Sequence, residues 1–277
     1  MNLTDLVRAS LHEDVGTGDV TTEACVGADL TGMAVIRAKS DLVVAGHAPA
    51  QETFAQVRAV YKAEVPDGTA VSPGAVVARV TGPMRSLLTG ERVALNFLMR
   101  LSGIATHTRR CVSAAGGLKV VDTRKTTPLH RMLEKHAVRM GGAANHRFAL
   151  YDAVLIKENH IMAAGGVEAA VARCKAAVGG RFGVQVGVED LDELQQAIEA
   201  GADAVLLDNM DDTTLARAVT LADGRLLLEA SGGMTAERLP RLDGMGLDRV
   251  SMGGLIHQAR WADLSMRVEE GLTPPRA

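Results

Sequence analysis

The second half of the chain repeats one pattern, a short apolar run that ends in a polar residue and is followed by an amphipathic or charged stretch. The runs occupy residues 118–123, 153–158, 182–188, 204–209, 226–231 and 249–253. Continuous apolar strands that alternate with helices are typical of parallel βα units, whose strands are buried on both faces. The last four runs recur about every 21 to 22 residues, which suits a barrel. The span is shorter than the roughly 250 residues of a complete eight-unit barrel, so the sequence predicts six or seven strands.

The first part of the chain follows a different pattern. Residues 24–82 alternate short β-like runs with turn signals at Asp67-Gly68, Ser72–Gly74 and Gly82-Pro83, which predicts a small sheet. From Ser86 to Ala115 the apolar residues follow helical i, i+3, i+4 spacing, with one glycine interruption. This stretch predicts a helical layer that connects the small sheet to the parallel α/β part.

The composition excludes several classes of protein. The chain has 277 residues, is 47% hydrophobic and 23% charged, and carries a net charge of -3, as ordinary globular proteins do. The three cysteines have no metal-site spacing and do not form an even set, so a disulfide framework or zinc site is not expected. The first twenty residues have neither the basic n-region nor the apolar h-region of a signal peptide, and no apolar run is long enough for a membrane span, so we expect a cytoplasmic protein. With 3% aromatic residues and no broad basic surface, a small molecule is a better partner than nucleic acid.

Polar residues stand at the end of every apolar run. Because α/β barrels carry their chemistry at the carboxyl ends of the strands, these residues are the first candidates for a site. Any one of them is equally well a solubilising loop residue, but six in phase favour a site. They are Asp122–Lys125, Lys157–His160, Gly187, Asp208-Asn209, Glu229–Ser231 and Ser251.

Positive charge collects between Arg124 and Arg147, where six Lys or Arg residues face one acid, Glu134. Lys135 and Arg139, four residues apart, are expected on a solvated helix face. Lys157 falls inside an otherwise apolar strand, and a buried lysine is costly unless it meets an anion. The segment therefore predicts an anion site.

Negative charge follows, with nine acids and no Lys or Arg between Val184 and Asp212. Most of these acids lie on helix-like stretches, where solvation is the default explanation. Asp208 closes an apolar strand and is the best candidate for a side chain that binds Mg²⁺ or sugar hydroxyls. Cations on one side and a carboxylate on the other suit a polyanionic substrate with a divalent ion, as in phosphoryl or phosphoribosyl chemistry.

Two glycine pairs, in residues 231–234 (SGGM) and 251–254 (SMGG), stand where helices would begin. Glycine lets backbone N–H groups approach an anion closely, and a helix N-terminus favours negative charge. Since the last loops of α/β barrels often bind phosphate, these segments predict a phosphate site.

Several stretches resemble the quinolinate phosphoribosyltransferase family, also called carboxylating nicotinate-nucleotide pyrophosphorylase. They run from residue 10 to about 265 and include EDVGTGDVTT (13–22), VDTRKTTP (121–128), LEKHAVRMGGAANHR (133–147), LIKENHI (155–161), LLDNM (206–210) and EASGG (229–233). The DTRKTTP, NHR and LIKENH motifs, in that order, are specific to this family.

The resemblance implies an N-terminal open α/β sandwich at 1–112, onto which residues 260–277 pack back, and an incomplete barrel of about seven strands at 113–259. It implies a homodimer in which each barrel mouth is completed by the partner's N-terminal domain. The implied substrates are quinolinate and phosphoribosyl pyrophosphate, with Mg²⁺, and the products are nicotinate mononucleotide, pyrophosphate and carbon dioxide.

The resemblance also assigns site residues. Lys125, Lys157 and Asp208 are implied as catalytic, with Asp208 serving the ribose and, through the pyrophosphate, the metal. The ring carboxylates and phosphates would be bound by Arg124, Lys125, His146, Arg147 and Lys157, with Arg92 reaching across the dimer. Ser231, Gly232, Gly233, Ser251, Gly253 and Gly254 would hold phosphate.

This chain departs from the family pattern at four positions. Gln185 and Gly187 stand where the family usually has two glutamates, and Leu129 and His130 alter the loop beside Arg124 and Lys125. Two alternatives follow: a paralogue that acts on another carboxylated nitrogen heterocycle, and a non-catalytic homologue that binds a ligand.

Overall fold

The structure is a computed structural model that describes residues 2–269, and its chain divides into two compact units. The first unit contains the chain up to Arg109, the segment Thr127–Gly142 and the chain from Ala259 onward. The second contains Arg110–Thr126 and Ala143–Gln258. The chain therefore crosses between the units several times, and we describe each unit by itself.

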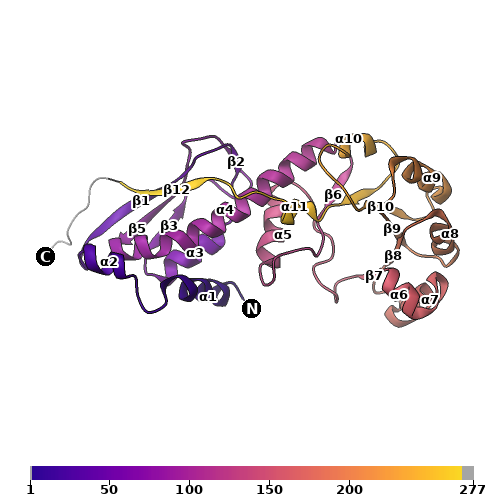
Figure 1. The fold of residues 1–277 in the computed structure, drawn as a ribbon, viewed down its shortest axis with the longest axis horizontal. Helices are drawn as coiled ribbons and strands as arrows, with labels where there is room; N and C mark the ends of the chain where they lie inside the picture. Colours follow the sequence, from indigo (N-terminus) through magenta and orange to yellow (C-terminus); the bar gives the residue numbers. More distant parts are fainter. Residues whose placement is uncertain (1, 270–277) are drawn as a thin grey trace. The chain divides into compact units, whose positions relative to one another are not determined.

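An antiparallel sheet in the order β12-β1-β5-β3 organises the first unit, beside a two-stranded ladder of β2 and β4 (Figure 1). Its strands are β1 (Thr31–Ala38), β2 (Leu42–Val43), β3 (Val60–Ala63), β4 (Ala70–Val71), β5 (Val76–Pro83) and β12 (Leu264–Val268). Its helices are α1 (Leu3–Val15), α2 (Val20–Cys25), α3 (His47–Gln56), α5 (Arg131–Met140) and most of α4 (Met84–Ala114).

The core of the first unit lies between this sheet and the helices α3 and α4. Ile36 of β1, Phe54 of α3 and Leu98 of α4 are each fully buried in one apolar cluster. Position 90 of α4 favours glycine, because a Cβ on Gly90 would lie 3.1 Å from the Phe54 ring. Burial of these aliphatic and aromatic side chains is the main force that holds the unit together.

The small sheet and the long helix were predicted from sequence, and both are present. The helix runs from Met84 to Ala114 without a break at its glycines. Helix α3 was missed, because its Ala, Gln and Thr residues give no clear apolar face in the sequence. The prediction that Lys135 lies on a solvated face is wrong: its side chain is only 2% exposed, whereas Arg139 is exposed.

Strand β12, near the end of the sequence, pairs antiparallel with β1, near its start, and places Ile36 opposite Met266. The segment 260–277, which the resemblance implies packs back on the N-terminal part, contains β12. The remainder of the segment, residues 270–277, lies outside the described residues.

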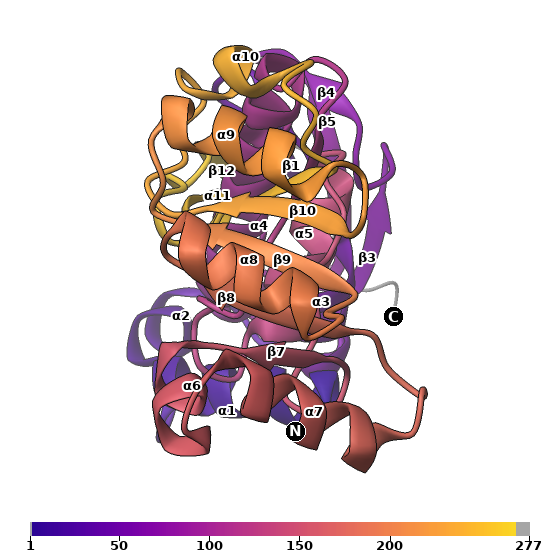
Figure 2. The same ribbon diagram turned by 90° about the vertical axis from the view of Figure 1, so that its right-hand side faces the viewer.

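A parallel sheet in the order β6-β11-β10-β9-β8-β7 forms the second unit. Figure 2 shows β8, β9 and β10 side by side, with α8 and α9 lying across them. The strands are β6 (Lys119–Val121), β7 (Val154–Ile156), β8 (Val184–Val188), β9 (Ala204–Asp208), β10 (Leu227–Ser231) and β11 (Arg249–Ser251). The helices are α6 (Glu158–Ala164), α7 (Val167–Val178), α8 (Leu191–Glu199), α9 (Asp212–Ala222), α10 (Leu239–Leu242) and α11 (Gly254–His257).

All six predicted strands of the barrel part are present, in parallel as predicted, although each is shorter than its apolar run. The difference matters at β7, which ends at Ile156. Lys157 was predicted inside this strand, and that prediction is wrong: it precedes α6 at the N-cap position and is partly exposed.

The sequence predicts six or seven strands and the resemblance implies about seven; the parallel sheet has six among the described residues. A further parallel contact joins Val121 to Ala144 as a single bridge, where the chain runs back toward the site. Within residues 2–269 no ladder joins β7 to β6, so the sheet is open at that side.

The compact units and the expected domain boundaries follow different criteria. The boundaries at residues 112 and 259 place Thr127–Gly142 with the barrel, whereas the contacts within the structure group that segment with the first unit. The boundaries stay a prediction.

Among the helices of residues 2–269, none has the length and apolarity that a membrane crossing requires.

Candidate active site

A cavity of about 550 Å³ opens at the carboxyl ends of the parallel strands, and every residue that lines it belongs to the second unit. The position follows from the topology, because parallel strands bring the loops after their carboxyl ends to one edge of the sheet. The lining comes from the loops after β6, β7, β9, β10 and β11 and from the segment that contains His146 and Arg147.

The structure brings twelve of the thirteen predicted substrate-binding residues to this cavity. They are Arg124, Lys125, His146, Arg147, Lys157, Asp208, Ser231, Gly232, Gly233, Ser251, Gly253 and Gly254. The remaining one, Arg92, lies on α4 in the first unit, where its side chain is exposed. The roles assigned to these residues stay predictions, while their convergence is a feature of the structure.

Four of these residues give the cavity a positively charged side. Arg124 and Lys125 follow β6, Arg147 follows the Val121–Ala144 bridge, and Lys157 follows β7. Burial, and then the like charge of Arg124, lower the pKa of Arg147. The Nε of Arg124 is buried and has no acceptor among the described residues. Two like charges in one cavity, one with an unused donor, indicate a site that binds an anion.

The loops after β9 and β10 form the opposite side of the cavity and pack closely on one another. The N–H of Asn209 donates to the carbonyl of Ser231 over 3.0 Å. Gly232 adopts φ +82°, and a Cβ there would lie 2.1 Å from Oδ1 of Asn209. Gly233 also has a positive φ, +57°. Successive glycines in this conformation leave backbone N–H groups accessible to an anion.

The loop after β11 contacts the cationic side. A Cβ on Gly253 would lie 2.8 Å from Cδ of Lys125, so the lysine stem passes over this glycine. Ser251, at the end of β11, is only 4% exposed and also lines the cavity. The predicted phosphate segments thus line the same cavity as the predicted cations.

A buried polar network lies at the floor of the cavity. Nε2 of His146 is 3.2 Å from both Oε1 of Gln185 and Oε2 of Glu229. Gln185 donates to Glu229 over 3.0 Å, and Nε of Arg249 donates to the same carboxylate over 2.5 Å. The backbone N–H of Arg147 donates to Nδ1 of His146 over 2.7 Å, so that nitrogen acts as an acceptor.

The charge state of Glu229 follows from this network. Its side chain is fully buried, and burial by itself raises the pKa of a carboxyl group. The hydrogen bond and charge of His146, with the charge of Arg249, outweigh that effect and lower the pKa of Glu229 to about 2. The carboxylate is therefore ionised at neutral pH and orients His146 beneath the cationic side.

Gly187 of β8 lies next to Lys157. A Cβ built on Gly187 would meet Cγ of Lys157 at 4.0 Å and the carbonyl of Ile156 at 3.5 Å, which are ordinary contacts. The backbone there is not in the left-handed region, so a Cβ fits at this position without strain. The second departure, Gln185, is different in kind, because its amide is a member of the buried network.

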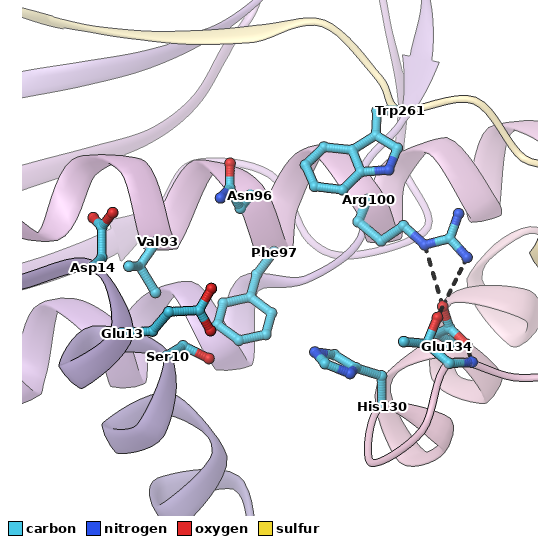
Figure 3. A pocket seen from close by; sticks show the side chains of 11 residues that line it. Ser10, Glu13, Asp14, Val93, Asn96, Phe97, Arg100, His130, Glu134 and Trp261 are labelled. Carbon is cyan, nitrogen blue, oxygen red and sulfur yellow. Dashed lines mark hydrogen bonds and ion pairs between the residues drawn. The ribbon is translucent and has the colours of Figure 1, made fainter.

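Leu129 and His130, the other departures, do not line this cavity. Leu129 has a positive φ of +69° and is mostly exposed. His130 lines a separate pocket within the first unit, where Figure 3 shows it with Phe97, Trp261 and the ion pair of Arg100 and Glu134. Arg100 contacts Glu134 over 2.8 Å, and the carboxylate also accepts from the N–H of Thr127. The pair holds α5 against α4.

Several residues of the cavity were not predicted. Arg249, which belongs to the buried network and does not itself line the cavity, carried no signal in the sequence, since it stands at the start of a strand and its partner Glu229 is known only from the fold. Thr235, His257 and Gln258 also line the cavity. Thr123 lines it too, and it was among the strand-end candidates Asp122–Lys125.

The described residues contain no group of three or more His, Cys, Asp or Glu side chains placed to bind a metal. Asp208 lines the cavity as a single carboxylate. One carboxylate fits Mg²⁺ held largely by substrate phosphates and water, and does not fit a site built from protein ligands alone.

Comparisons with known proteins agree with the geometry of the site. Family models described as the quinolinate phosphoribosyl transferase N-terminal and C-terminal domains match residues 19–102 and 104–267. The chain is 41% identical over 274 residues to the probable nicotinate-nucleotide pyrophosphorylase (carboxylating) of Bacillus subtilis (strain 168), covering 97% of this chain and 94% of that one. It is 40% identical to the Homo sapiens protein named carboxylating nicotinate-nucleotide pyrophosphorylase, over 97% of this chain and 92% of that protein. The crystal structure of NadC from Streptococcus pyogenes is 41% identical, with a TM-score of 0.92 and coverage of 98% and 96%.

Proposed function

Because this chain belongs to the quinolinate phosphoribosyltransferase family, we propose that it joins quinolinate to phosphoribosyl pyrophosphate. The reaction releases pyrophosphate and carbon dioxide and gives nicotinate mononucleotide for NAD synthesis. The enzyme is accordingly a pentosyltransferase of the nicotinate-nucleotide diphosphorylase (carboxylating) class.

One observation carries the proposal: the like-charged pair of Arg124 and Arg147 in the cavity, with Lys157 beside it. Quinolinate has two adjacent carboxylates, and a cluster of fixed cations is what takes two such groups out of water. Arg124 offers an unused buried donor, and the guanidinium of Arg147 is positioned by a hydrogen bond to the carbonyl of Ala153. These residues bind and orient the base, so that its ring nitrogen points toward the ribose.

The sugar phosphate binds on the opposite side. The N–H groups of Gly232 and Gly233, together with the segment from Ser251 to Gly254, hold phosphate groups. Cleavage of the bond between ribose C1 and pyrophosphate builds positive charge on the sugar and negative charge on the leaving group. Asp208 stabilises the sugar side, and Lys125 the phosphate side.

Mg²⁺ is the cofactor that this substrate calls for. Asp208 would hold it, mostly through the pyrophosphate, and the ion would neutralise charge on the leaving group. The protein residues contribute positioning and fixed charge around it.

Loss of the 2-carboxylate as carbon dioxide needs no base, but the carbanion it leaves at C2 must take up a proton, from water or from an acid in the cavity, to give the product. Once the ring nitrogen carries the ribose, its positive charge stabilises the carbanion that remains when carbon dioxide leaves. The cationic side then holds the other carboxylate, which stays in the product.

We further propose a homodimer in the cytoplasm. Arg92 is an exposed cation on α4 in the first unit, and in a dimer it would complete the partner's barrel mouth. The family resemblance supports this assignment of Arg92. No membrane-spanning helix is present in residues 2–269, and a small soluble substrate pair is consistent with this location.

A second candidate function is favoured by Gly187. Gly187 lies next to Lys157 and brings no carboxylate there, which suits a different carboxylated nitrogen heterocycle. A third candidate is a non-catalytic homologue that binds the ligand and does not consume it. The persistence of the cations and of Asp208 favours an enzyme.

The test is a steady-state assay of nicotinate mononucleotide formation by the wild type and by Gly187→Glu. The wild type is expected to turn over in a reaction that chelation of Mg²⁺ abolishes. Gly27→Glu, which adds the same residue at an open position of the first unit, is the control and should match the wild type. No product at any protein concentration refutes the activity.

The same assay separates the alternatives. Faster turnover with another carboxylated heterocycle than with quinolinate identifies a paralogue. Calorimetry that shows tight ligand binding without product identifies a binding protein, and a gain of activity in Gly187→Glu shows that the natural role has moved.

A further inference from the structure

Arg238 is the one guanidinium in the described part of the second unit that contacts both loops on the phosphate side of the cavity. Its Nη2 donates to the carbonyl of Met210 over 2.6 Å, in the loop after β9. Its Nη1 donates to the carbonyl of Gly232 over 3.3 Å, in the loop after β10. The side chain is 15% exposed and does not line the cavity, so it acts from behind these loops.

A carboxylate fixes the orientation of this guanidinium. Nε of Arg238 donates to Oδ1 of Asp212, the first residue of α9, over 2.9 Å. Asp212 is held in turn by Arg241, whose Nε donates to Oδ2 over 2.8 Å. All three kinds of nitrogen in the Arg238 guanidinium are therefore used, each by a different segment. Only the planar fork of arginine has donors in this arrangement, and the single ammonium of lysine does not.

The two loops that Arg238 joins carry different parts of the site. Asp208 precedes Met210 by two residues, and Gly232 is itself part of the glycine segment. The loops already touch through the Asn209–Ser231 hydrogen bond and the close approach of Gly232 to Asn209. Arg238 closes this contact from the far side, so the carboxylate of Asp208 and the N–H groups of Gly232 and Gly233 keep a fixed separation.

We propose that Arg238 is a positioning residue that sets the geometry of the phosphoribosyl pyrophosphate half of the site by joining the loops after β9 and β10. This role rests on the proposed function. It predicts that loss of the fork weakens binding of the phosphorylated substrate and leaves the quinolinate half, built from the loops after β6 and β7, unchanged.

The test compares Arg238→Gln and Arg238→Lys with Arg241→Gln as the matched control. Arg241 contacts the same Asp212 carboxylate but neither loop carbonyl, and it is 64% exposed. Arg238→Gln removes charged hydrogen-bond donors from both loop carbonyls. Because hydrogen bonds from charged groups are stronger than neutral ones, we expect the KM for phosphoribosyl pyrophosphate to rise roughly tenfold. The KM for quinolinate and the values for Arg241→Gln should stay within about twofold of the wild type. Arg238→Lys keeps the charge but not the fork, and should behave like Arg238→Gln.

A second measurement keeps this inference separate from the proposed activity. Calorimetric titration of the wild type and Arg238→Gln with inorganic pyrophosphate and Mg²⁺ should show the same roughly tenfold loss of affinity, with the melting temperature recorded for each variant. That result supports the positioning role even if quinolinate is not the natural base. Equal effects of Arg238→Gln and Arg241→Gln, equal rises in the KM for both substrates, full activity of Arg238→Lys, or unchanged pyrophosphate affinity would each overturn it.

Discussion

The two sides of the cavity differ in how their polar groups are satisfied when no substrate is bound. On the phosphate side, the loops after β9 and β10 are joined by backbone hydrogen bonds, by close glycine packing and by the Arg238 fork. On the base side, Arg124 and Arg147 are held near each other, and the Nε of Arg124 has no acceptor among the described residues. The first arrangement is complete without substrate, while the second stores like-charge repulsion that only an anion relieves.

The difference in order and charge between the two sides determines how each side binds its ligand. A side that is already ordered binds its ligand without further loss of conformational freedom. A side that carries unneutralised charge gains most when a dianion arrives, and discriminates against neutral bases. The floor network of Glu229, Gln185 and His146 contacts the base side through His146, whose Nδ1 accepts from the backbone N–H of Arg147.

The largest expected effect comes from removal of one member of the charged pair. Arg124→Gln should lower kcat/KM for quinolinate about a hundredfold, because it removes a charge-assisted contact to a carboxylate. The melting temperature should stay the same or rise, since repulsion with Arg147 is removed. Steady-state kinetics and thermal unfolding measure both effects.

The control is Arg181→Gln, at an exposed arginine whose Nε donates to the carbonyl of Val178. Its kinetics should match the wild type. If Arg124→Gln instead lost stability without a change in kcat/KM, the base side would be a structural ion cluster and the comparison would fail.

An intermediate effect is expected on stability from the floor network. Glu229→Gln should lower the free energy of unfolding at neutral pH by about 3 kcal/mol, because it leaves buried partners without their counter-charge. Chemical denaturation at a series of pH values measures it.

The pH dependence follows from the lowered pKa of Glu229. The folded-state value is about 2, against 4.5 for the unpaired group, so the carboxylate adds stability above pH 4.5. That contribution is lost as the pH falls from about 4.5 toward 2. The difference in unfolding free energy between wild type and variant should therefore shrink across this window. A constant difference would show that the charge of Glu229 is not what stabilises the floor.

The smallest expected effect is on kcat, from a substitution at Gly253, where the phosphate side contacts Lys125. Gly253→Ala places a methyl group against the stem of Lys125 and must move it. Because the lysine is flexible, stability should change by less than about 1 kcal/mol, while kcat falls about fivefold through the displaced ammonium. Gly183→Ala, whose Cβ meets only Asp203 at 3.7 Å, is the matched control. Equal kinetics of the two variants would indicate that the contact with Gly253 does not position the Lys125 ammonium.

Much of this site was predictable because strand ends are local features of the sequence. The apolar runs that end at Asp208, Ser231 and Ser251 predicted both the strands and the cavity lining. Lys157 was misplaced because an apolar run shows where a strand lies and does not show that the chain leaves the sheet one residue earlier.

The burial of Lys135, the partners of Arg249 and Arg238 and the close approaches of two glycines depend on tertiary contacts, which no local sequence pattern predicts. Lys135 follows the spacing of a solvated face, but the helix lies within the first unit and the side chain is buried. The partners of Arg249 and Arg238 come from strands and loops that only the folded sheet brings near. The glycines at 232 and 253 were predicted for phosphate binding, whereas their close approach to Asn209 and Lys125 needed the structure.

The pairing of β12 with β1 has a consequence for the synthesis of this protein. Strand β1 begins at Thr31, and its neighbour on one side is not made until Leu264–Val268 leaves the ribosome. The segment Thr127–Gly142 also joins the first unit only after part of the second has been made. The first unit therefore cannot finish folding before β12 has been made, and until then one edge of β1 stays open to other chains.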